Sequence, residues 1–98
     1  MIRIDILSQN PEEAVMRVAG FVQSAQDIAL VAQEGNRCLE TSKLLVLDLE
    51  HLHELSDHAV PMLKQWQAQG RLQIRAWHYL IDFVLQYHGV VPKKEDRP

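Results

Sequence analysis

The chain has 98 residues, of which 47% are hydrophobic, and its formal net charge is −3 with a pI near 5.9. This length suits one domain with a single packed core, which association with other subunits would further stabilise, so we expect an oligomer. The acidic balance offers no basic field, and we therefore expect no direct nucleic-acid partner.

Targeting signals and cysteine usage both favour the cytoplasm. Charged residues interrupt the apolar residues at the N-terminus, which is not typical of a signal peptide. No apolar run approaches the roughly 20 residues that a membrane helix needs. Cys38 is the single cysteine, so no internal disulfide can form. We therefore expect a cytoplasmic protein without membrane contact.

The first third of the chain predicts a strand, a helix and a second strand. Three isoleucines in residues 2–7 alternate with charged side chains, which indicates a half-buried strand near a sheet edge. Asn10 can accept hydrogen bonds from the first free amides of a helix, and apolar residues recur at helical spacing over 11–25. The apolar run 27–32 then predicts a buried strand, which the turn-forming residues 33–36 end.

Residues 44–47, Leu-Leu-Val-Leu, are the stretch around which the fold is expected to form. An unbroken apolar run suits a central parallel strand that is buried on both faces. Asp48 closes this run. Because ligands and partners meet open α/β sheets at the carboxyl ends of the strands, residues 48–58 are the predicted functional edge.

The second half continues the alternation of strands and helices. Residues 49–55 are ambiguous between a helical turn and an irregular loop that lies on the core. A helix follows, capped by Ser56 or Asp57, with Pro61 in its first turn and Gly70 at its end. Alternating apolar residues then predict a further, more exposed strand over 71–77.

The end of the chain completes the predicted architecture. An amphipathic pattern indicates a final helix over 80–89, and a flexible charged tail follows at 92–98. Four strand–helix repeats predict a single α/β domain over residues 1–91. Short connections and right-handed crossovers would give a small, mostly parallel four-stranded sheet with helices on both faces.

Cys38 is the one soft nucleophile of the chain. The neighbouring Arg37 would help to hold a thiolate if both side chains faced solvent, which would suit a persulfide or sulfur-carrying thiol. Free cysteines are more often small buried apolar side chains, and this alternative stays open.

Three histidines cluster after the central strand, and they favour a contact surface that responds to pH, because histidines titrate near neutrality. Their spacing matches no strong zinc signature, so we expect no metal and no other cofactor. The candidate interface residues are Asp48, His51, His53, Ser56, Asp57 and His58.

The order, length and apolar pattern of the segments resemble the DsrE/DsrF/DsrH-like family, especially its small DsrH/TusB subunit. The matching segments are residues 7–11, 27–35, 43–47 and 77–83. The resemblance implies an accessory, non-catalytic subunit of a cytoplasmic sulfur relay for tRNA 2-thiolation, which docks with DsrE/DsrF-like paralogues or with itself. In related subunits the transfer cysteine follows the third strand, so no relay role is carried over to Cys38.

A second resemblance covers the second half of the chain. Residues 44–56, 71–74 and 84–90 resemble the strand, switch helix, strand and closing helix of the STAS domain of anti-sigma-factor antagonists. Ser56 lies one or two positions from the phosphoacceptor serine of that family. The resemblance implies a protein-interaction module that serine phosphorylation switches. It ranks second because the predicted first half lacks an opening hairpin; a small oligomeric α/β protein of unassigned role is the third hypothesis.

Overall fold

The computed structural model describes residues 1–90, and the predicted charged tail lies outside the described residues. The elements in chain order are β1 (Ile2–Gln9), β2 (Glu13–Val22), α1 (Ala25–Thr41), β3 (Leu44–Leu49), β4 (Leu52–Leu55), the 3-10 turn η1 (Asp57–Ala59), α2 (Val60–Ala68), β5 (Leu72–Trp77) and α3 (Tyr79–Tyr87).

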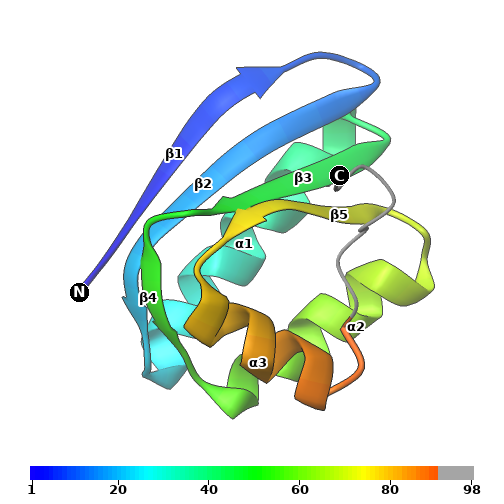
Figure 1. Ribbon diagram of the computed structural model, residues 1–98. Helices are drawn as coiled ribbons and strands as arrows, with labels where there is room; N and C mark the ends of the chain where they lie inside the picture. Colours follow the sequence, from blue (N-terminus) through cyan, green and yellow to red (C-terminus); the bar gives the residue numbers. More distant parts are fainter. Residues whose placement is uncertain (91–98) are drawn as a thin grey trace.

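The sheet has the order β1-β2-β3-β5, and β4 also pairs with β2. The β1–β2 pair is antiparallel and the other pairs are parallel, so the predicted mostly parallel α/β sheet is confirmed, with five strands instead of four. The three helices lie on one side of the sheet (Figure 1), not on both faces as predicted. Because β2, β3 and β5 follow one another in a single direction, right-handed crossovers place α1 and α2 on the same face.

The chain opens with a β-hairpin where the sequence predicted a strand and a helix. Asn10 does accept hydrogen bonds from two backbone amides, those of Glu12 (2.8 Å) and Glu13 (3.0 Å), as a helix cap would. These bonds instead close the turn that leads into β2. Alternate residues of β2 point into the core, including the buried Ala14 and Met16, and this period of two fits a strand. The predicted helix over 11–25 is therefore wrong.

Helix α1 replaces the predicted strand over 27–32 and the predicted turn over 33–36. Its start is a capping box: Ser24 Oγ accepts from the Asp27 amide at 3.1 Å, and the Asp27 carboxylate accepts from the Ser24 amide at 3.2 Å. Val31 and Cys38 are among its buried residues and follow helical spacing.

Gly35 lies in the middle of α1 because the ring of Trp66 on α2 packs directly against it. A Cβ at position 35 would lie 2.5 Å from Cη2 of Trp66, closer than side chains pack. The indole Nε1 of Trp66 also donates a hydrogen bond to Oδ1 of the neighbouring Asn36 at 2.9 Å. The glycine that the sequence suggested as a turn is a site of close helix–helix packing.

The predicted central strand is confirmed as β3, which is parallel to β2 on one side and to β5 on the other. The pairing of β3 with β2 ends at Arg17 and Asp48. From Gly20 onwards β2 pairs with β4 instead, so that β3 and β4 pair with consecutive parts of the same strand. The ambiguous stretch 49–55 therefore contains a short strand, not a helical turn.

The last elements match the predictions closely. Ser56 caps η1, Pro61 lies in the first turn of α2, and Gly70 takes a φ of +70° just after that helix. Strand β5 and helix α3 then follow as the alternating and amphipathic patterns predicted.

Candidate functional site

The predicted functional edge includes an exposed corner between β4 and α2, which we call the cap corner and define as residues 56–58. The Ser56 amide donates to the Val22 carbonyl at 2.8 Å, which fixes the corner to the end of β2. The Ser56 hydroxyl oxygen accepts from the His58 amide at 3.1 Å. Ser56 is half-buried, whereas Asp57 and His58 are exposed. The corner thus presents three polar side chains on a backbone that β2 holds in place.

The cap corner also contacts the C-terminal end of α3. The Asp57 carboxylate lies 3.2 Å from Nε2 of His88, the residue that follows the helix. Asp57 is largely exposed and His88 is partly covered. Sequence analysis did not select His88, because the two residues are far apart in the chain and no local pattern links them.

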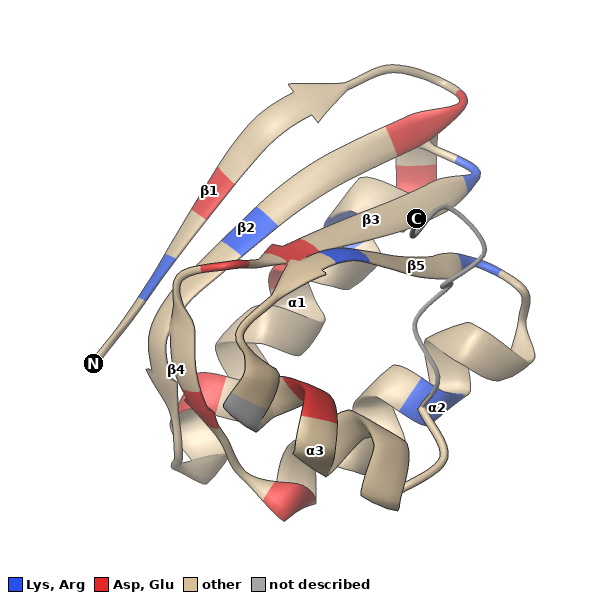
Figure 2. Ribbon diagram, viewed as in Figure 1, with Lys and Arg blue, Asp and Glu red and all other residues tan. Residues whose placement is uncertain are grey.

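Asp48 lies away from the cap corner, on the face of the sheet opposite the helices. Its carboxylate accepts from Arg17 on β2 and from Arg75 on β5, both at 3.2 Å, and from the Glu50 amide at 3.1 Å. In Figure 2 a red segment of β3 lies between blue segments of β2 and β5, in keeping with these contacts.

The ionised form of Asp48 is the favoured one. Burial pushes the pKa of this carboxyl upward, since its side chain is only 3% exposed. The hydrogen bond from the Glu50 amide and the two arginines outweigh burial, and together they lower the pKa below its usual value. Because this carboxylate is buried and already paired, it is not available as a base for a bound ligand. Its contacts instead link β3 to β2 and to β5.

The three predicted histidines do not converge. His51 and His58 are exposed at different turns, and His53 lies on β4 beside two other rings. Within residues 1–90, no group of three or more His, Cys, Asp and Glu side chains is placed to hold a metal ion.

Cys38 is buried on the inner face of α1, with 3% of its surface exposed. Burial raises the pKa of the thiol, Glu34 raises it further, and Arg37 opposes both. Arg37 lies 3.8 Å from Glu34, so its charge is shared with a carboxylate. These surroundings favour the protonated thiol and give no support to a sulfur carrier, whose role stays a prediction.

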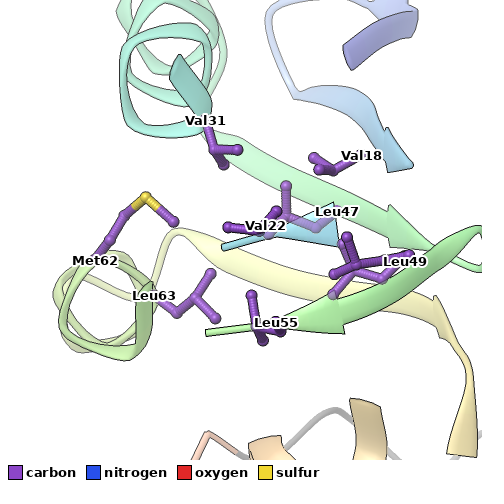
Figure 3. A pocket seen from close by; sticks show the side chains of 9 residues that line it. Val18, Val22, Val31, Leu47, Leu49, Leu55, Met62 and Leu63 are labelled. Carbon is purple, nitrogen blue, oxygen red and sulfur yellow. The ribbon is translucent and has the colours of Figure 1, made fainter. Parts of the chain in front are cut away.

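One small cavity lies in the core under α1 and α2 (Figure 3), with a volume of about 20 Å³. Its lining is entirely apolar and consists of Val18, Val22, Val31, Leu47, Leu49, Leu52, Leu55, Met62 and Leu63. This volume is far below the several hundred Å³ typical of ligand pockets. The cavity is therefore a packing gap.

The opening hairpin, the parallel strands that follow it and the helices on one side together form a fold like that of a STAS domain, the second of the two resemblances. The chain shares its fold with the anti-sigma factor antagonist SpoIIAA in its unphosphorylated form, with a TM-score of 0.69 and 12% identity. The superposition covers 92% of this chain and 82% of SpoIIAA.

Comparisons of the sequence itself gave no further relative. No protein-family model matches the chain. No curated protein matches it either. Within residues 1–90, no helix is long and apolar enough to cross a membrane.

The resemblance to the DsrE/DsrF/DsrH-like family is not supported. It rested on a strand over 27–32 and a helix over 11–25, which the structure replaces with α1 and β2. The sequence predicted no opening hairpin, which counted against the STAS domain, but β1 and β2 do form one. The sulfur relay and its DsrE/DsrF-like partners therefore have no structural basis in this fold.

Proposed function

We propose that this chain is a STAS-like protein-interaction module that contacts its partner through the cap corner. The observation that carries the proposal is the exposed pair of Asp57 and His58, held by Ser56 at the end of β4 in a fold shared with an anti-sigma factor antagonist. Loops that a rigid scaffold holds in place commonly carry binding residues. A protein partner suits this site, because the polar side chains of Asp57 and His58 stand exposed on the surface of a fold shared with a protein that antagonises another protein.

Phosphorylation of Ser56 is the proposed switch. SpoIIAA has been described specifically in its unphosphorylated form, which makes phosphorylation the regulation to test here. Ser56 is half-buried and directly precedes η1 and α2, where an added phosphate would meet backbone N–H groups. The phosphate would also lie beside Asp57, so that the charge of the corner would become strongly negative without loss of the fold.

The other serines are less suited to this role. Ser42 is buried and its hydroxyl donates to the Asn10 carbonyl, and Ser24, the cap of α1, lies outside residues 44–56, which resemble the strand and switch region of STAS domains. Ser8 is exposed but lies on the edge strand β1 opposite Val15, whereas the cap corner is fixed to Val22 at the other end of β2. Ser8→Ala is therefore a suitable control.

We propose an anti-sigma factor with serine-kinase activity as the partner, and the test is phosphorylation of the full chain by such a protein from the same organism, followed by peptide mass spectrometry. We expect one phosphate on the peptide that contains Ser56, its loss in Ser56→Ala, and its retention in Ser8→Ala. Modification of another residue, or none, would exclude the switch. Binding of the kinase to an unmodified Ser56→Ala chain would still support the interaction module, so the two parts of the proposal are separable.

A further inference from the structure

Helix α3 presents a row of exposed aromatic side chains on its outer face. Tyr79, Phe83 and Tyr87 are four residues apart, and 75%, 72% and 77% of their surfaces are exposed. The opposite face of the same helix carries the buried Ile81 and Leu85. The aromatic residues are therefore not needed for the core, and side chains at this spacing form one continuous row on a helix.

Neighbouring rings extend this row at both ends. The Tyr79 ring stacks on His78 with centroids 4.7 Å apart, and His78 faces His53 on β4 at 6.4 Å. His53 in turn lies 5.8 Å from Phe21, which is exposed on β2. At the other end Tyr87 meets His88 edge to face at 5.0 Å. We call this set the aromatic stripe: Phe21, His53, His78, Tyr79, Phe83, Tyr87 and His88.

The surface around the aromatic stripe is acidic. The segments 50–63 and 76–90, which supply most of it, contain no Lys or Arg and hold all five histidines of the chain. They contribute four acids, Glu50, Glu54, Asp57 and Asp82, and Figure 2 shows acidic positions along β4 and on α3. Lys64 on α2 is a nearby cation, since a Cβ at Gly89 would lie 3.7 Å from its Nζ.

The exposed aromatic rings and the acids beside them indicate which kind of partner would bind this surface. Exposed aromatic rings bind apolar side chains and the faces of cationic groups, and acids beside them attract lysine and arginine. A second copy that docked by the same face would oppose four acids with four acids, which is unfavourable at neutral pH. A helix fits a straight row of side chains because its own anchors recur at three- and four-residue spacing.

We propose that the aromatic stripe binds a basic amphipathic helix of a partner protein. The apolar face of that helix packs on Tyr79, Phe83 and Tyr87, and its lysines and arginines contact the flanking acids and ring faces. The surface meets the cap corner at the Asp57–His88 contact but does not depend on phosphorylation of Ser56. It would add a second point of attachment for the same partner.

The test uses the full chain and two synthetic helical peptides that share one leucine-rich face. The first carries lysine and arginine on its flanks, and the second carries glutamate at the same positions. In an NMR titration at low salt, we expect the basic peptide to shift amide signals of residues 78–88 and the acidic peptide to leave them unchanged. Phe83→Ala and Tyr79→Ala should each weaken binding of the basic peptide by about tenfold or more.

Leu30→Ala is the matched control, because Leu30 is an exposed apolar residue on α1, a helix that contributes no residue to the stripe. It should bind the basic peptide as the wild type does. Equal binding of both peptides, absence of binding, or shifts confined to other elements would overturn the proposal. Self-association that shifts the same residues would overturn it as well, because a second copy would then be the occupant. None of these outcomes depends on the kinase experiment.

Discussion

The carboxylate of Asp57 and the imidazole of His88 meet at 3.2 Å, Oδ1 to Nε2, although 31 residues separate them in the chain. This contact joins the cap corner before α2 to the end of α3, so that two exposed surfaces of different character become neighbours. One is small and polar, and the other is aromatic with an acidic rim. A partner that covers both would gain specificity from the corner and contact area from the stripe.

The hydroxyl of Ser56 should contribute to stability, apart from its proposed role as a phosphorylation site. Ser56→Ala removes the acceptor for the His58 amide, and loss of a helix cap costs about 1 kcal/mol. Thermal unfolding should then occur about 4–8 °C lower for a domain of this size. Ser56→Asp keeps an acceptor at this position and should unfold near the wild-type temperature. An equal loss in both variants would show that the cap hydrogen bond is not the cause.

Asp48→Asn should destabilise the fold, because the change leaves two arginines without their shared anion. Breaking a buried pair costs about 3–5 kcal/mol, and the partial exposure of Arg17 and Arg75 reduces this to about 1–3 kcal/mol. Urea denaturation monitored by circular dichroism gives the difference. An unchanged free energy of unfolding would mean that the arginines find other partners.

The same residue should control part of the acid sensitivity. The folded pKa of Asp48 lies below the value of about 3.9 expected in the unfolded chain, so ionised Asp48 stabilises the fold above that pH. This contribution is lost as the pH falls through the folded pKa. Stability measured as the pH is lowered from about 6 to about 2, through the ordinary pKa of an aspartate, should fall less steeply in Asp48→Asn than in the wild type. The lowered pKa of Asp27 in the capping box leaves a residual slope in the variant.

Gly35→Ala tests the close packing between α1 and α2. Alanine favours a helix over glycine by about 1 kcal/mol, but the added methyl would collide with the Trp66 ring, and overpacking costs about 1–3 kcal/mol. We expect a net loss of stability in urea denaturation. The loss should shrink in a Trp66→Phe background, where the contacting ring atoms are absent. A double-mutant cycle without coupling would contradict this packing.

Cys38 should react slowly with a thiol reagent in the native protein and rapidly in denaturant. Its burial and its raised pKa both reduce the fraction of accessible thiolate. With a reagent that releases a chromophore when it reacts with a thiol, the absorbance measures the rate of labelling. Rapid labelling of the native chain would restore a chemical role for this cysteine.

Sequence patterns located the second half of the fold well and the first half poorly. The apolar run of β3, Pro61 in the first turn of α2 and Gly70 after it act locally, and each was placed correctly. Asn10 was assigned its true hydrogen bonds but the wrong element, because the same amide contacts close a hairpin turn or cap a helix. Gly35 was wrongly interpreted as part of a turn. A glycine is needed there because the ring of Trp66, 31 residues later in the chain, packs against it.

In the candidate site, too, sequence patterns found the residues that are adjacent in the chain and missed those that only tertiary contacts bring together. Ser56, Asp57 and His58 are neighbours in the chain, and the structure groups them at one corner. His88 and the aromatic stripe join that surface only through tertiary contacts. The spacing of Tyr79, Phe83 and Tyr87 opposite Ile81 and Leu85 was nevertheless visible in the sequence and could have indicated an exposed aromatic face.

The most direct test is the affinity of the full chain for its proposed partner, an anti-sigma factor with serine-kinase activity, measured by isothermal titration calorimetry. We predict that the unmodified chain and Ser8→Ala bind alike and that Ser56→Asp, which remains folded, binds at least about tenfold more weakly, or 1.4 kcal/mol. Equal affinities for the wild type and Ser56→Asp, or no binding by either, would contradict an interaction module that is switched at the cap corner.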